Sequence, residues 1–269
     1  MATLARMPTP KRLFRATLPA VMLVLLACAP RLGAQVTETT QTIEPGGVLL
    51  RMDAISLGIN PDTSAPNQYD ALALGTTLVY AGLTDSVDLE FGAQLFLRDT
   101  YSTDGTDHTE SGIGDITLRP KWTFWRDPAS GQAAAIVPYV MLPTDSKAVG
   151  NDSVQGGVIL PWSMDIGAGT KAAAMAEWDE LRNVANTRYD TRWYGSAELS
   201  WHLGTTLGAF AEATLSDSTA GSSTFEGTAG VGATLSVSHG FQWAIEASKV
   251  LGPGRNGWTE VLSFRWKIL

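Results

Sequence analysis

The feature that most constrains this chain is an alternation of apolar and polar residues that recurs from about residue 48 to the end. Within 87–97, one face carries apolar side chains: Val87, Leu89, Phe91, Ala93, Leu95 and Leu97. The other face carries Asp88, Glu90, Gly92 and Gln94, with Phe96 as the exception. A period of two residues is that of a β-strand, because successive side chains point to opposite faces. The alternation therefore predicts strands with one apolar face and one charged face.

Twelve such strands are predicted along the chain. They span 48–58, 70–81, 87–97, 115–125, 133–143, 154–164, 171–180, 192–203, 207–215, 225–237, 241–250 and 258–268. Short links at 82–86, 126–132, 165–170, 204–206 and 238–240 alternate with longer polar loops at 59–69, 98–114, 144–153, 181–191, 216–224 and 251–257. This rhythm is typical of bacterial outer-membrane barrels, whose short turns are periplasmic and whose longer loops are external. Both ends of the mature chain are then expected on the periplasmic side.

A soluble β-sandwich also alternates and also carries Gly-rich turns. A sandwich needs strand faces apolar enough to fill a shared core, whereas here the second face is charged in strand after strand. Aromatic residues near strand ends, such as Trp122, Trp201 and Trp243, suit a membrane interface. The pattern favours an all-β fold, a transmembrane up-and-down antiparallel β-barrel of about 12 strands.

The first 34 residues read as a targeting segment. Its basic start precedes an apolar run, 16–29, that is too short to cross a bilayer as a helix. A small residue suits the peptidase, so cleavage is predicted after Ala34. This divides the chain into a signal peptide, 1–34, and an outer-membrane β-barrel, 35–269. In a rival interpretation, Cys28 is the lipidated first residue of a lipoprotein.

Cleavage after Ala34 removes five basic residues and no acidic one. The mature chain keeps 14 Lys and Arg against 27 Asp and Glu, a formal charge of −13. Nucleic-acid binding requires clustered Lys and Arg, so no nucleic-acid partner is expected. The sole cysteine, Cys28, leaves with the signal peptide. The expected partners are outer-membrane lipid, the barrel assembly machinery and a small-molecule solute.

Two strand features predict local structure. Pro120 and Pro138 fall inside adjacent predicted strands, where each removes a backbone donor, so bulges or a gap in pairing are expected there. The last strand, 258–268, must pair with 48–58, because an unpaired edge inside lipid leaves backbone groups unsatisfied. The chain ends in Leu269 rather than an aromatic residue, so recognition for assembly should depend on Phe264 and Trp266 together with the apolar terminus.

Three segments resemble a known family. Residues 112–122, Gly-Ile-Gly-Asp-Ile-Thr-Leu-Arg-Pro-Lys-Trp, resemble the Gly-x-Gly-Asp-x-x-Leu-x-x-Lys-aromatic strand start of the transporter-like outer-membrane family named for the MetA pathway of phenol degradation. Residues 82–90 are similar to that family's turn and third strand. Pro138 with 142–144 resembles its Pro-x-x-x-Leu-Pro-Thr-Gly segment, although Asp145 stands where the family usually has glycine. The resemblance covers 80–146, and elsewhere only the strand pattern agrees. It implies a barrel that passes small, often aromatic or hydrophobic, compounds, and it supplies no catalytic residues.

The candidate functional residues are charged side chains that share the polar face by parity. These lumen-lining candidates are Arg51, Asp53, Asp88, Glu90, Arg119, Lys121, Glu177, Glu198, Glu212, Glu226 and Glu246. They could set the charge selectivity of a pore. Alternatively, they could pair across strands and plug the lumen, since small barrels fill their interiors with side chains.

Signals of catalysis or of a cofactor are weak. The sequence has no Gly-x-Ser-x-Gly, His-Glu-x-x-His or Gly-x-x-x-x-Gly-Lys motif. His202 with Ser200 is the only local pairing that a hydrolase could use, and a polar rim pair explains it better. Asp99, Asp104, Asp107 and Glu110 lack EF-hand spacing and suit a solvated loop. We therefore predict no enzyme activity, no metal and no cofactor.

Three functions remain open from the sequence: a passive channel for small solutes, a structural or adhesive barrel without transport, and a membrane-bound hydrolase.

Overall fold

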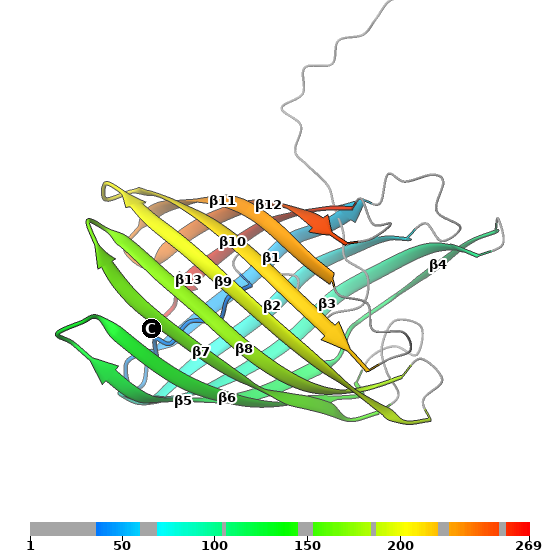
Figure 1. Cartoon of the computed structure of the whole chain (residues 1–269), viewed down its shortest axis with the longest axis horizontal. Helices are drawn as coiled ribbons and strands as arrows, with labels where there is room; N and C mark the ends of the chain where they lie inside the picture. Colours follow the sequence, from blue (N-terminus) through cyan, green and yellow to red (C-terminus); the bar gives the residue numbers. More distant parts are fainter. Residues whose placement is uncertain are drawn as a thin grey trace, which may run out of the picture.

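The computed structural model describes residues 36–59, 69–103, 106–144, 153–183, 187–219, 226–252 and 257–269. These residues form a closed antiparallel β-barrel (Figure 1). Its strands are β1 (Val48–Ile59), β2 (Tyr69–Thr84), β3 (Val87–Thr103), β4 (Thr106–Gly112), β5 (Ile116–Asp127), β6 (Gln132–Leu142), β7 (Gln155–Gly167), β8 (Thr170–Arg182), β9 (Tyr189–Leu203), β10 (Leu207–Ser218), β11 (Glu226–Ser238), β12 (Phe241–Leu251) and β13 (Trp258–Lys267). The described residues include no helix long and apolar enough to cross a membrane.

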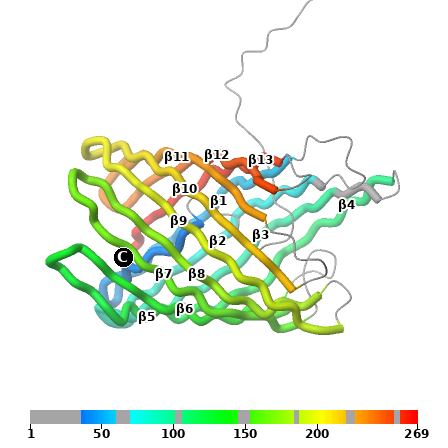
Figure 2. The backbone as a smooth tube through the Cα atoms, viewed as in Figure 1, coloured from blue at the N-terminus to red at the C-terminus, as the bar shows by residue number. Residues whose placement is uncertain are grey.

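The strands follow one another around the wall in chain order, and β13 pairs with β1 to close it. β4 pairs with β3 beyond the part of β3 that pairs with β5, so β3 and β4 form a hairpin that extends past the rim. The wall therefore has twelve strand positions, as predicted. Closure is direct, because the Val48 amide donates to the Leu269 carbonyl at 3.1 Å. The tube in Figure 2 shows the strands inclined in the same sense around the barrel.

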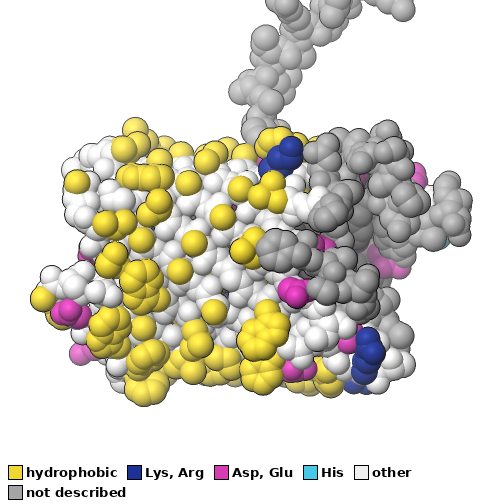
Figure 3. All heavy atoms as spheres, viewed as in Figure 1, with side chains coloured by type: hydrophobic (Ala, Val, Ile, Leu, Met, Phe, Trp, Pro, Cys, Tyr) yellow, Lys and Arg dark blue, Asp and Glu magenta, His cyan; other side chains and the backbone are white. Residues whose placement is uncertain are grey.

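The two faces of the wall differ as the alternation predicts. Leu89 and Phe91 point outward and are exposed, whereas Asp88 and Glu90, which alternate with them, are fully buried. Hydrophobic side chains spread over the outer wall in Figure 3, and charged ones gather toward the ends. An apolar exterior around a polar interior is the arrangement of a barrel that spans a membrane.

The alternation changes phase at one height in the wall. Ala54 is the extra residue where the register between β1 and β13 shifts, and Gly75 beside it has a φ of +65°. A left-handed backbone suits glycine, which has no Cβ to clash. Beyond this point Leu97 pairs with Ala73, which is fully buried, so Leu97 lies on the inner face. The prediction that Leu97 lies on the apolar outer face is wrong, and the same change of phase explains Phe96 as an exception.

The two prolines interrupt pairing as predicted. Pairing between β5 and β6 stops at Leu118 opposite Val140 and resumes at Trp122, which leaves out Pro120 and Pro138. The register is unchanged across this gap and shifts once, between Trp122 and Trp125. Neither proline has an N–H to donate to the ladder.

Candidate functional site: the barrel lumen

Residues 36–47, called here the lumen segment, precede β1 and lie along the inside of the barrel. Thr37, Glu38 and Thr40 are buried, although none belongs to a strand. At the end of the barrel that carries the short turns, called here the turn end, the Gly46 amide donates to the Gly82 carbonyl at 2.9 Å. The segment thus runs from the interior to the turn end. This differs from the expected periplasmic N-terminus, because Val36 lies inside the wall.

A buried ion cluster, formed by Glu38, Glu90, Arg119 and Lys121, joins the lumen segment to the wall. Lys121 Nζ lies 2.7 Å from Glu90 Oε1 and 3.0 Å from Glu38 Oε1. Arg119 Nε lies 2.9 Å from Glu90 Oε2, and the same guanidinium pairs with Glu38. Two acids and two bases balance, which is the condition under which buried charges are tolerated.

Side chains of the wall hold the backbone of the lumen segment above and below this cluster. Glu212 accepts hydrogen bonds from the amides of Val36, at 2.8 Å, and Thr37, at 2.5 Å. Near the turn end, Asp88 accepts from the Ile43 amide at 3.0 Å. Between them, the Thr123 hydroxyl donates to the Thr40 carbonyl at 2.7 Å. Carboxylates therefore satisfy buried amides that a segment outside the sheet cannot pair with a neighbouring strand.

The turn end carries a further contact outside the membrane-spanning strands. Glu44 pairs with Lys267, and that side-chain hydrogen bond is the main reason why the pKa of Glu44 lies below its ordinary value. Both side chains are about half exposed, so the pair is accessible to solvent and screened by salt.

The part of the wall next to the ion cluster is apolar inside, because β6 pairs with β5. Val137, Ile159 and Met175, from β6, β7 and β8, form a buried cluster inside the wall. Val36 and Tyr139 pack against it. The lumen segment therefore has one side on an ionic wall and its first described residue on an apolar one.

A second buried pair lies farther along β8 and β9. Arg192 Nη2 and Nε lie 2.7 and 2.8 Å from Asp179 Oδ2, and the Tyr139 hydroxyl donates to Asp179 at 2.5 Å. Sequence reasoning missed this pair. Its signal was available, since Asp179 shares the parity of the candidate Glu177.

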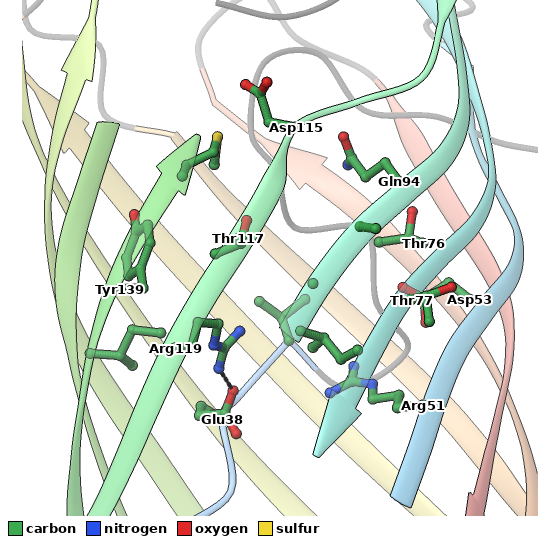
Figure 4. Close-up of a pocket in the computed structure, with 16 residues that line it drawn as sticks. Glu38, Arg51, Asp53, Thr76, Thr77, Gln94, Asp115, Thr117, Arg119 and Tyr139 are labelled. Carbon is green, nitrogen blue, oxygen red and sulfur yellow. Dashed lines mark hydrogen bonds and ion pairs between the residues drawn. The ribbon is translucent and has the colours of Figure 1, made fainter. Parts of the chain in front are cut away.

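A cavity of about 110 Å³ remains between the lumen segment and the wall. Its polar lining includes Arg51, Asp53 and Arg119, and its apolar lining includes Met141 and Ile159. Figure 4 shows Arg119 and Glu38 pointing toward each other at one end of this space, with Asp115 and Gln94 at the other. The lining of this cavity therefore combines charged and polar groups with apolar ones.

Comparison with known protein families identifies the family of this chain. The family described as "Putative MetA-pathway of phenol degradation" matches residues 54–267. The chain belongs to this family. No curated protein matches the sequence.

Solved structures similar to this MetA-pathway family member are outer-membrane barrels. The COG4313 outer membrane channel from Pseudomonas putida F1 is 11% identical, with 85% of this chain and 98% of that chain covered and a TM-score of 0.63. The NanC porin is 9% identical, with 81% and 100% covered and a TM-score of 0.52. The translocator domain of the autotransporter NalP from Neisseria meningitidis is 12% identical, with 82% and 88% covered and a TM-score of 0.54. At these identities the likeness concerns the fold, which is that of an outer-membrane β-barrel.

Two of the family-like segments meet the lumen segment. Lys121, near the end of the Gly-x-Gly-Asp motif, binds Glu38, and a Cβ on Gly82 would lie 2.2 Å from the Glu44 carbonyl oxygen. Gly114 in the same motif lies against β3 instead, where a Cβ would be 2.8 Å from Gln94 Cβ. Both positions therefore require the absence of a side chain.

The structure places the eleven predicted lumen residues as follows. Buried are Asp53, Asp88, Glu90, Lys121, Glu177, Glu212 and Glu246. Half-buried are Arg51, Arg119, Glu198 and Glu226. Glu90, Arg119 and Lys121 come together in the ion cluster, and Glu198 is the cross-strand neighbour of Glu212. Their role in charge selectivity stays a prediction.

The remaining predictions concern His202, a possible metal site, and positions elsewhere in the chain. His202 is exposed, and its Nδ1 lies 3.2 Å from the Gly169 carbonyl oxygen. Among the described residues, no group of three or more His, Cys, Asp or Glu is placed to hold a metal. Asp104, Cys28 and the cleavage site after Ala34 lie outside the described residues.

Proposed function

We propose that this protein is a passive channel for small solutes, which enter the lumen and pass between the lumen segment and the wall. The observation that carries this proposal is the cavity beside Arg51 and Arg119. A barrel that served structure alone would gain stability from filling this space, because packed interiors leave few voids.

The lining favours a small solute with an apolar body and a polar group. Leu78, Met141 and Ile159 offer apolar contact, while Arg51, Thr76 and Thr117 offer hydrogen bonds. Small aromatic compounds have this character. The COG4313 protein is called an outer membrane channel, which agrees with a channel here.

The alternatives receive less support. A structural or adhesive barrel does not account for the mixed cavity. A membrane-bound hydrolase would need a nucleophile beside a base, yet the His202 ring faces the Gly169 carbonyl at the rim. We therefore infer that the protein is not an enzyme. The barrel assembly machinery as a partner, and the lack of a nucleic-acid partner at a formal charge of −13 for residues 35–269, remain part of this proposal.

Conductance in a planar bilayer tests the proposal. The purified barrel should conduct weakly, and Glu38→Ala should conduct more, because Arg119 and Lys121 then lose one of their two carboxylates and hold the lumen segment less firmly. Glu44→Gln is the matched control, since Glu44 belongs to the same segment but pairs outside the ion cluster. Heat-modifiable mobility on gels checks that each variant is folded. If folded wild type and Glu38→Ala both fail to conduct and to admit small aromatic solutes into liposomes, the channel proposal is wrong.

A further inference from the structure

A groove lies on the outer wall at β7, β8 and β9, near the end of the barrel that carries the longer loops, called here the loop end. It takes no part in the lumen. It is about 310 Å³ in volume and is lined mainly by Val154, Gly156, Val158, Trp178 and Tyr189. Gly156 contributes bare backbone to this lining, and a Cβ there would lie 2.5 Å from the Tyr139 carbonyl oxygen of β6. The larger side chains on both sides therefore stand above a strip of bare backbone.

The outward side chains of this wall change from aromatic to acidic and then to basic toward the loop end. Trp178 and Trp193 face each other across β8 and β9, with ring centroids 6.2 Å apart and planes 19° apart. One pair farther on, Glu180 accepts from Trp178 Nε1 at 3.1 Å and from the Thr191 hydroxyl at 2.9 Å. The wall thus passes from aromatic rings to a carboxylate within one strand repeat.

The last step is cationic. The Arg182 guanidinium lies 4.8 Å from the centroid of the Tyr189 ring. Arg188 belongs instead to the inner side of the wall, because its Nε donates at 2.9 Å to Asp190, which is buried. Figure 3 shows hydrophobic side chains over this face giving way to charged ones toward the loop end.

We propose that this groove binds a phosphorylated glycolipid of the outer leaflet. One acyl chain lies against Gly156, Val158 and Trp178. A sugar hydroxyl or amide donates to Glu180, and the phosphate accepts from Arg182. The order of apolar groove, acceptor and cation along the wall matches the order of acyl chain, sugar and phosphate in such a lipid. Guanidinium groups bind phosphate through charge-assisted hydrogen bonds. The inference rests on the loops being external, as short turns and longer loops imply, and it does not depend on solute passage.

Native mass spectrometry of the folded barrel in detergent tests this inference with bisphosphorylated lipid A as the probe. Wild type should carry lipid A as a discrete adduct, and Arg182→Gln should lower its occupancy about tenfold. Val158→Trp, which fills the groove and keeps Arg182, should lower it as well. Dephosphorylated lipid A should bind wild type no better than lipid A binds Arg182→Gln.

Lys249→Gln is the matched control. Lys249 also lies at the loop end over an aromatic ring, 5.5 Å from the Trp258 centroid, but on the opposite part of the wall. This variant should bind lipid A as wild type does. The inference is overturned if Arg182→Gln keeps wild-type occupancy, if Lys249→Gln lowers it equally, or if removing the phosphates changes nothing. Each variant is first shown to be folded by its heat-modifiable mobility.

Discussion

Lys121 Nζ lies 2.7 Å from Glu90 Oε1, and solvent reaches neither side chain. The same ammonium lies 3.0 Å from Glu38, which belongs to no strand. A lysine of β5 thus connects the wall of the barrel to the lumen segment. A buried ion pair adds little net stability compared with apolar residues, but breaking one leaves an uncompensated charge.

Glu38→Gln is therefore expected to destabilise the barrel by about 3 kcal/mol, because it leaves two buried cations with Glu90 alone. Urea unfolding in liposomes measures the change. Glu44→Gln should have little effect, because Glu44 is exposed and pairs with an exposed lysine. Equal midpoints for Glu38→Gln and wild type would show that the cluster is not a stabilising contact.

Gly82→Ala is expected to displace the lumen segment at the turn end, because the new Cβ would lie 2.2 Å from the Glu44 carbonyl oxygen. The wall itself should persist. Limited proteolysis of the folded variant should then cleave within 36–47 faster than in wild type. Gly195→Ala is the control, since its Cβ would contact only the Met175 carbonyl oxygen, at 3.7 Å. Identical cleavage rates in both variants would contradict the close approach.

The outward face should reject charge. Leu89→Arg places a cation against lipid at mid-strand and should cost about 2–4 kcal/mol of unfolding free energy. Gln94→Arg points instead toward the cavity and avoids the lipid penalty. Refolding titrations of both variants measure the difference. Equal losses would contradict the assignment of inner and outer faces.

The loop end should face the outside of the cell. An epitope tag inserted at Asp104 is expected to be labelled on intact cells. A tag at Ser130, in the β5–β6 turn, should be labelled only after the outer membrane is broken. Asp217, which the sequence places in a loop, lies within β10 opposite Trp193, so an insertion there would interrupt pairing. Labelling in the reverse pattern would invert the topology.

Deleting Phe264 to Leu269 should abolish assembly and leave export intact. The deletion removes the pairs Met52–Phe264 and Leu49–Lys267, together with the hydrogen bond from the Val48 amide to Leu269. The exposed edge of β1 would then leave several backbone groups unsatisfied in lipid, at several kcal/mol each. Fractionation and heat-modifiable mobility check the result. Recovery of a folded barrel in the outer membrane would refute this role of the last strand.

Most of the wall could be predicted from the sequence, because each strand carries its own alternation. The predicted 87–97 and 207–215 are shorter than β3 and β10, since the loop ends of these strands are polar on both faces. Leu97 was assigned to the wrong face because the bulge at Ala54 lies in a different strand. The alternation within one strand cannot reveal a change of phase that comes from a bulge in another strand of the sheet.

The lumen segment could not be predicted in the same way. Thr-Glu-Thr-Thr-Gln at 37–41 has no periodicity and resembles a solvated tail. Contacts between residues far apart in the sequence hold the segment, since Glu38 pairs with Arg119 and Lys121. Parity placed these two cations on the inner face but did not indicate what they would bind. Of the predicted charges, Arg119 and Lys121 pair with Glu38, and Asp88 and Glu212 accept from backbone amides of the segment. The Asp179–Arg192 pair was not foreseen.

The contacts of the lumen segment are ordered along the chain. Ile43 binds Asp88, 45 residues away; Thr40 contacts Ser163 at a separation of 123; Thr37 contacts Ser196 at 159; and Val36 binds Glu212 at 176. In these four contacts later strands meet successively earlier residues of the segment; the ion cluster, in which β5 meets Glu38, is an exception. If strands join the growing sheet in the order of the chain, each finds its inner partner already in place. The segment then serves as a core around which the sheet curls, and the final seam between β13 and β1 closes over an interior that is already occupied.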